Sequence, residues 1–139
     1  MNRDAFSRPL EILLVDDDRE DAEMTIETFR AASVPCRVSW VCDGVEGLQF
    51  LRREEPYLDA PSVDLVVLDV QMPRMDGREM LAELRADENL RHLTVVVMTG
   101  SLIHRAILES ESFRADGFFI KPVDVGQFVP LVRRLRFHR

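Results

Sequence analysis

The sequence lacks the features of a secreted, membrane-spanning or nucleic-acid-binding protein. Its first residues contain no apolar segment of a signal peptide, and no apolar run approaches the ~20 residues of a membrane span. Acidic residues outnumber basic ones by 25 to 18, so the net charge is −7. An acidic domain repels nucleic acid and anionic membranes, which disfavours both as main partners. We therefore expect a cytoplasmic protein that binds neither.

Cysteine is scarce, and the two cysteines are badly placed for a disulfide. Cys36 and Cys42 flank the β-like run 37–41. In an extended chain their Cα atoms would lie roughly 20 Å apart at about 3.3 Å per residue. A disulfide needs a separation under about 7 Å. We expect two free thiols, which suits a reducing cytoplasm.

Apolar runs alternate with amphipathic stretches five times along the chain. The pattern predicts strands at 10–15, 37–41, 63–68, 93–98 and 117–120, and helices at 19–32, 45–53, 78–86, 102–110 and 125–136. The third and fourth strands show little alternation, which indicates burial on both faces of a parallel sheet. We predict one α/β domain over 10–136, a flavodoxin-like (βα)5 doubly wound parallel sheet with strand order 2-1-3-4-5. Residues 1–9 and 137–139 are expected to be tails, and no output domain is expected.

Three residues bear on where the helices begin and how they run. Asp18 and Asp43 precede two of the predicted helices and are expected to be their N-caps. Pro130 falls inside the last predicted helix, where it has no N–H to donate. We expect it to kink that helix or to delay its start by about a turn.

Polar residues follow the strands that meet in the middle of the predicted sheet. They are Asp16-Asp17-Asp18 after the first strand, Asp69 after the third, Thr99-Gly100-Ser101 after the fourth and Lys121-Pro122 after the fifth. Ligands of this fold class bind at the carboxyl ends of the strands, between the first and the third. Three or four carboxylates, a hydroxyl and an ammonium are therefore expected in one cleft.

Carboxylates that converge repel one another, and a bound cation would relieve this repulsion. Two such charges about 4 Å apart cost about 4 kcal/mol at an effective dielectric near 20. An all-oxygen set with few protein ligands favours Mg²⁺ over Ca²⁺. A plainer alternative is that Asp17 and Asp18 cap a helix and Asp69 begins a loop, and Asp18 by itself is better explained as a cap.

Lys121 follows the apolar run 118–120, where a charge needs a partner. Asp69, or an anion bound to it, is the natural partner. Thr99 could also have a purely structural role, in which its hydroxyl at the end of the strand bonds to the local backbone. A carboxylate surrounded by a cation, an ammonium and a hydroxyl has the parts of a phosphoryl-transfer site. The carboxylate can itself take the phosphoryl group.

Four motifs, in this order, resemble the receiver domain of two-component response regulators: LLVDDD, VVLDVQMPRMDG, VVVMTGS and GFFIKP. The resemblance spans roughly residues 10–136. Three further stretches resemble the stand-alone regulators associated with bacterial phytochromes: FLRREEPYLDAP, DGREMLAELRADENLR and KPVDVGQF.

The resemblance implies a role for each matching residue. Asp69 would be the phosphoacceptor. Asp16 and Asp17 would hold Mg²⁺, with Asp69 and the backbone carbonyl of Gln71 as further ligands. Thr99 would bind the phosphoryl group once it arrives, and Lys121 would pair with it.

Two further parts of the receiver pattern are present. Phe118 stands at the position of the aromatic switch residue, without the hydroxyl that a tyrosine would supply. Pro73 and Gly77 match the turn after the acceptor, where the glycine is expected to supply an awkward backbone angle.

The implied function is a phosphorylation-switched, single-domain response regulator rather than an enzyme, with chemistry limited to gaining and losing the phosphoryl group. Its partner would be a sensor histidine kinase, with a bacteriophytochrome as one candidate, or a histidine phosphotransfer protein. A hydrolase of the haloacid dehalogenase type is one alternative, because residues 16–18 contain Asp-x-Asp. However, Arg19 follows where that family has Thr or Val. The second alternative is a receiver-like module that is never phosphorylated. That alternative predicts loss of the residue at Asp69 or Lys121, and both are present.

The resemblance also implies a homodimer through the face formed by the fourth helix, fifth strand and fifth helix, which phosphorylation would alter. Apolar residues of the last helix sweep an arc of about 160°, where a helix covered on one side needs about 100°. Leu108 and Leu131 are the expected contacts.

Overall fold

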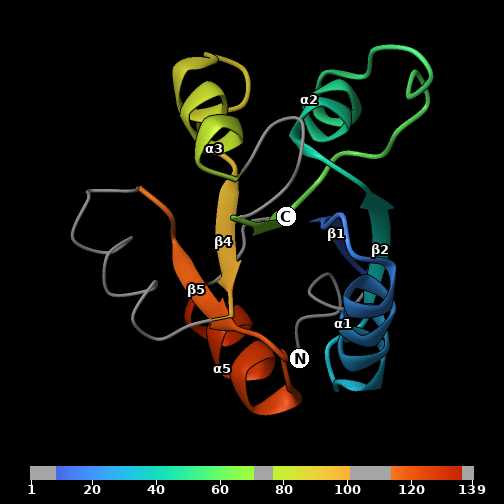
Figure 1. Cartoon of the computed structure of the whole chain (residues 1–139), viewed down its shortest axis with the longest axis vertical. Helices are drawn as coiled ribbons and strands as arrows, with labels where there is room; N and C mark the ends of the chain where they lie inside the picture. The colour runs from blue at the N-terminus through green and yellow to red at the C-terminus, as the bar shows by residue number, and fades with distance from the viewer. Residues whose placement is uncertain (1–8, 71–76, 101–113, 136–139) are drawn as a thin grey trace, which may run out of the picture.

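Five parallel strands form one sheet in the predicted order (Figure 1). The structure, a computed structural model, describes residues 9–70, 77–100 and 114–135. The strands are β1 (Leu10–Val15), β2 (Cys36–Val41), β3 (Leu65–Asp69), β4 (Thr94–Thr99) and β5 (Gly117–Ile120), and the order is β2-β1-β3-β4-β5. Val15 pairs with Val41 on one side and with Leu68 on the other, so neighbouring strands end together.

Helices cover both faces of the sheet (Figure 1). The described helices are α1 (Arg19–Ala31), α2 (Gly44–Arg52), α3 (Gly77–Ala86) and α5 (Val125–Leu135). Leu13 packs with α2 and α3, whereas Leu14 packs with α1 and α5. Every residue of β3 is buried, and so is every residue of β4 except the half-buried Thr94, which confirms the burial predicted from their apolar runs. The helix predicted at 102–110 lies outside the described residues.

Three phenylalanines join α1, β5 and α5 on one face of the sheet. Phe29 and Phe128 stack with their ring centroids 4.3 Å apart. Phe119 packs beside both, with centroids 6.3 and 6.4 Å away. All three are fully buried, so they fix the strand that carries Lys121 against α1.

The two predicted N-caps are confirmed. Asp18 accepts a hydrogen bond from the Asp21 N–H, and Asp43 accepts one from the Glu46 N–H. Each carboxylate satisfies an N–H that the first turn of its helix leaves without a partner. The start of α1 is therefore fixed directly after the aspartates that follow β1.

Of the two effects expected from Pro130, a kink or a delayed start of the last helix, the delayed start is wrong. Helix α5 begins at Val125 and contains Pro130. Asp124 accepts a hydrogen bond from the Gln127 N–H at 2.9 Å, which caps the first turn. The Gln127 side chain also exchanges two hydrogen bonds with the Ile120 backbone. These bonds hold the first turn in place ahead of the proline.

Leu131 does not face a partner, contrary to the sequence-based expectation. It is 8% exposed and belongs to the core between the sheet and helices α1 and α5. Gly117 allows this approach, because a Cβ there would lie 2.8 Å from Leu131 Cδ1. Leu108 lies outside the described residues.

The two cysteines are free thiols, as predicted; Cys36 is half-buried and Cys42 is exposed. Cys36 lies on the edge strand β2, and its thiol points to the Phe29 carbonyl at 3.5 Å. Across the described ranges, none of the helices has the length and apolarity needed to cross a membrane.

The role expected for Gly77 needs correction. Among the described residues no glycine has a positive φ, so Gly77 does not supply an unusual backbone angle. Its place is set by close packing instead. A Cβ there would collide with the Asp69 carbonyl oxygen and lie 2.7 Å from Val70 Cα. The Gly77 N–H donates to the Val70 carbonyl, so α3 starts directly against the end of β3.

Replacing Gly77 by alanine should therefore destabilise the fold by about 1–3 kcal/mol, because the colliding atoms are backbone and cannot rotate away. The measurement is urea unfolding. Gly126→Ala is the control, since the nearest atom to its added Cβ is a side-chain oxygen of Asp124 at 3.3 Å rather than a backbone atom. An equal loss in both variants would contradict the packing explanation.

Candidate functional site

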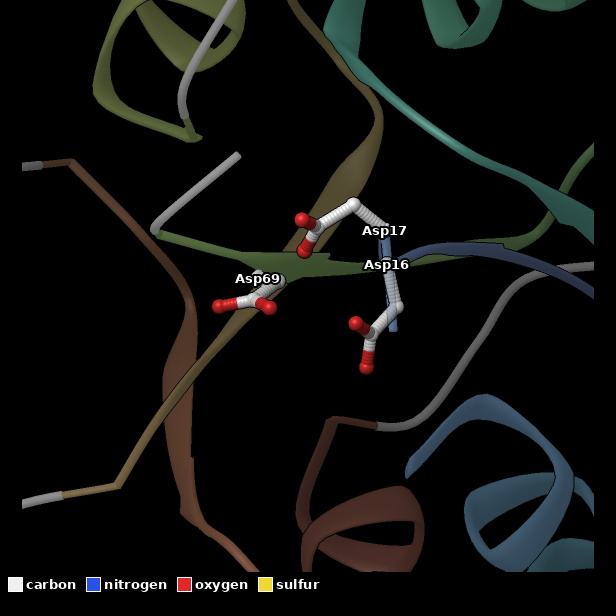
Figure 2. Close-up of side chains that lie close together, drawn as sticks. All are labelled: Asp16, Asp17 and Asp69. Atoms are coloured by element: carbon white, nitrogen blue, oxygen red, sulfur yellow. The ribbon is translucent and has the colours of Figure 1, made fainter. Parts of the chain in front are cut away.

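Three carboxylates meet where β1 and β3 end (Figure 2). Each of Asp16, Asp17 and Asp69 offers an oxygen, and these oxygens all lie within 4.8 Å of one another. Asp16 and Asp17 directly follow β1, and Asp69 is the last residue of β3. The structure thus brings together the three aspartates that strand order predicted to converge.

The three side chains reach the site from different directions. Leu14 and Val67 both pack on the face of α1 and α5, so Asp16 and Asp69, two residues further on, continue that face. Asp17 leaves the backbone in another direction than Asp16 (Figure 2). Asp16 and Asp69 are buried, whereas Asp17 is exposed.

Lys121 places an ammonium among these carboxylates. Its Nζ lies 3.0 Å from Asp69 Oδ2 and 3.2 Å from Asp16 Oδ2. Its backbone N–H donates to the Thr99 carbonyl at 2.8 Å, which ties the end of β5 to the end of β4. The expected partnership of Lys121 with Asp69 is therefore confirmed.

Asp21 is a further partner of Lys121 that the sequence pattern did not indicate. Its Oδ2 accepts a hydrogen bond from Nζ at 3.2 Å. Asp21 lies in the first turn of α1, four residues beyond Asp17. The sequence did contain a signal for this contact. Asp21 is an acidic residue one helical turn after Asp17, and the first turn of α1 lies beside the carboxyl ends of the strands.

The pKa values of Asp16 and Lys121 are both raised, but for different reasons. Burial raises the pKa of Asp16 to about 6, although the Asp18 N–H and Lys121 favour its ionised form. Burial acts to lower the pKa of Lys121. The hydrogen bond to Asp69 and the attraction of Asp69 and Asp16 outweigh it, so this pKa lies above its usual value. Lys121 therefore stays positively charged near neutral pH.

The donor set fits a hard divalent cation. Asp16 Oδ2 is fully buried and accepts no well-aligned hydrogen bond, even though Lys121 Nζ is 3.2 Å away. Burying a carboxylate oxygen that accepts no aligned hydrogen bond costs folding free energy unless a cation compensates its charge. Oxygen ligands from two or three carboxylates suit Mg²⁺, which keeps part of its water shell. Gln71, the expected fourth ligand, lies outside the described residues.

Thr99 and Phe118 lie on one face of neighbouring strands. Phe118 pairs with Val97 in the ladder between β4 and β5, and Thr99 follows two residues after Val97 on the same face. Thr99 is buried at the end of β4. Phe118 is half-buried and packs against the core under α2 and α3. Gly100 is exposed, and Ser101 lies outside the described residues.

A wider groove of about 500 Å³ lies at the other end of the sheet. The C-terminus of α2 and the segments before β3 and β4 line it, including Arg53, Val63 and Leu93. None of the converging aspartates, nor Lys121 or Thr99, lines this groove. The reactive groups are thus concentrated at the carboxyl ends of the strands.

Comparison with known proteins gives a consistent assignment. Residues 12–133 match the model of the family described as response regulator receiver domain. Among curated proteins, the chain is similar to response regulator Rcp1 of Synechocystis sp. The two are 27% identical over 130 residues, which cover 94% of this chain and 88% of that protein.

Solved structures extend the comparison. The bacteriophytochrome response regulator AtBRR is 29% identical with a TM-score of 0.86, covering 95% of this chain and 96% of that one. The bacteriophytochrome response regulator RtBRR is 28% identical with a TM-score of 0.86, covering 95% and 81%. The Mn²⁺-bound form of Rcp1 is 27% identical with a TM-score of 0.72, covering 91% of each chain.

The raised pKa of Asp16 predicts how stability without metal depends on pH. The folded state favours neutral Asp16, so this contribution is complete below about pH 4 and is lost as the pH rises through about 6. Asp16→Asn should remove that decline, as measured by urea unfolding from pH 4 to 7 with EDTA. Asp18→Asn, which keeps the N-cap, should retain it. An identical pH profile for wild type and Asp16→Asn would contradict the assignment.

Proposed function

This chain belongs to the response regulator receiver domain family, and on that premise we propose that it is switched by phosphorylation of Asp69. Receiver-domain response regulators are signalling proteins of two-component systems, which implies a histidine kinase as partner. One observation carries the proposal for this chain. Lys121 Nζ lies 3.0 Å from Asp69 Oδ2, next to Asp16 Oδ2, a buried oxygen that accepts no aligned hydrogen bond.

The proposed step is transfer of a phosphoryl group from a kinase histidine to Asp69. A carboxylate oxygen of Asp69 forms a bond to phosphorus, and the bond from phosphorus to the histidine nitrogen breaks. The electron pair of that bond stays on the imidazole, and Asp69 becomes an aspartyl phosphate. Lys121 holds the acceptor carboxylate and offsets negative charge on the group that arrives.

Mg²⁺ is the proposed cofactor, held by Asp16, Asp17 and Asp69 with the carbonyl of Gln71. When bound, it would supply positive charge beside the phosphoryl oxygens. Asp16 Oδ2 supports this assignment, since it is the buried oxygen that lacks an aligned donor. The similar Rcp1 structure is described as an Mn²⁺-bound form, and Mn²⁺ is also a cation suited to oxygen ligands.

Thr99 and Phe118 are the proposed switch. A phosphoryl group on Asp69 would draw the Thr99 hydroxyl toward it. Phe118 lies on the same face of the sheet, two register positions away, and would shift into the space that Thr99 leaves. The change would alter the surface formed by β5 and α5.

A bacteriophytochrome kinase is the proposed donor, and the cytoplasm the proposed location. Both AtBRR and RtBRR carry the description bacteriophytochrome response regulator. The two free thiols support a reducing compartment. A histidine phosphotransfer protein is the other donor that the chemistry allows.

Phosphoramidate with Mg²⁺ should add one phosphoryl group to the wild type and none to Asp69→Asn, as read by intact-protein mass. EDTA should block the reaction. Asp18→Asn, a charge-matched change at a residue with a capping role, should still be labelled. A label that persists in Asp69→Asn would contradict Asp69 as acceptor. Continuous release of phosphate would favour a hydrolase, and failure to label the wild type would favour a module that is never phosphorylated.

We also propose that the chain forms a homodimer through the face that includes β5 and α5. Val125 is 41% exposed and begins an apolar stripe with Val129 and Val132, which are half-buried. Val125→Glu should weaken the dimer in sedimentation without loss of folding, because an acidic residue is favourable in a first helical turn. A wild type that stays monomeric with and without phosphodonor would contradict the dimer.

A further inference from the structure

The single tryptophan of the chain contacts the acidic pair from a neighbouring strand. Trp40 lies next to the end of β2, and its Nε1–H donates to the backbone carbonyl of Asp16 at 2.7 Å. The ring is half-buried against the core under α1 and α5. Trp40 is not one of the residues that the resemblance to receivers singles out.

The Asp16 carbonyl needs a donor from outside the sheet ladder. The regular pairing of β1 with β2 ends at Val15 and Val41, and the Asp16 N–H donates to the Val41 carbonyl at 3.1 Å. Asp16 is 0% exposed, so bulk water does not reach it. A buried carbonyl without a partner would be costly, and the Trp40 indole supplies that partner.

This hydrogen bond acts on the peptide unit that joins Asp16 to Asp17. Successive side chains of an extended strand point to opposite faces, yet both carboxylates reach the oxygens of Asp69 within 4.8 Å. The orientation of that peptide therefore decides whether the two carboxylates converge. The indole bond holds its carbonyl, and the Asp18 N–H holds Asp16 Oδ1 at 3.0 Å. Oδ2 lies 3.2 Å from Lys121 Nζ but accepts no aligned hydrogen bond, so it can also contact a bound cation.

We propose that Trp40 is a positioning residue for the Mg²⁺ site, and that its indole reports occupation of that site by a change in fluorescence. The proposal rests on the proposed function, in which Asp16 and Asp17 hold the cation. Trp40 acts through the backbone of Asp16 rather than by touching the metal. Its effect is thus on affinity, through preorganisation of two ligands.

The test compares wild type, Trp40→Phe and Val38→Ala. Phenylalanine keeps an aromatic ring and loses only the donor and part of the packing. Val38 is the matched control because it is half-buried on the same face of β2, packs against the same core and offers no polar group. Mg²⁺ affinity is measured by calorimetry, and stability by urea unfolding with EDTA.

We expect Trp40→Phe to bind Mg²⁺ about three- to tenfold more weakly, the range of one net hydrogen bond. Val38→Ala should lose stability and keep the wild-type affinity. Wild-type emission should change on Mg²⁺ addition, and the change should require higher Mg²⁺ in Asp17→Asn.

Equal affinity of wild type and Trp40→Phe would overturn the proposal, and so would an equal weakening in Val38→Ala, since packing would then explain both. Emission that stays constant while calorimetry shows saturation would overturn the reporter role. A wild type that takes up no Mg²⁺ would overturn the proposed function itself, together with this inference.

Discussion

The ammonium of Lys121 is the contact on which the rest of the site depends. It joins carboxylates that arrive from β1, β3 and α1, and without it Asp16, Asp21 and Asp69 would only repel one another. A single positive charge does not balance them, and Asp17 adds to the excess. The fold therefore assembles a site that is stable enough to form and still negative enough to take up a cation.

The sheet and the convergence of the reactive groups could be predicted because they depend on simple patterns. Unbroken apolar runs indicate buried parallel strands, and strand order then places Asp16, Asp69 and Lys121 at neighbouring ends. The bond from Trp40 to the Asp16 carbonyl could not be predicted, because it depends on a side-chain rotamer. Periodicity also misjudged Leu131, since it shows which residues share a helix face but not how closely Gly117 lets that face approach the sheet.

The site divides between the two faces of the sheet. Asp16, Asp69 and Lys121 belong to the face that α1 and α5 cover, where Phe29, Phe119 and Phe128 pack. Thr99 and Phe118 belong to the face under α2 and α3. A group that bonds to Asp69 and to Thr99 would therefore act on both layers of helices at once, even though it occupies only one end of the sheet.

The contact of Gly77 with the end of β3 has a mechanical consequence. The gap between the α3 backbone and the carbonyl of Asp69 is narrower than a methyl group. Because a closer approach would bring backbone atoms into collision, the Asp69 carbonyl could move toward α3 only if the start of that helix moved as well.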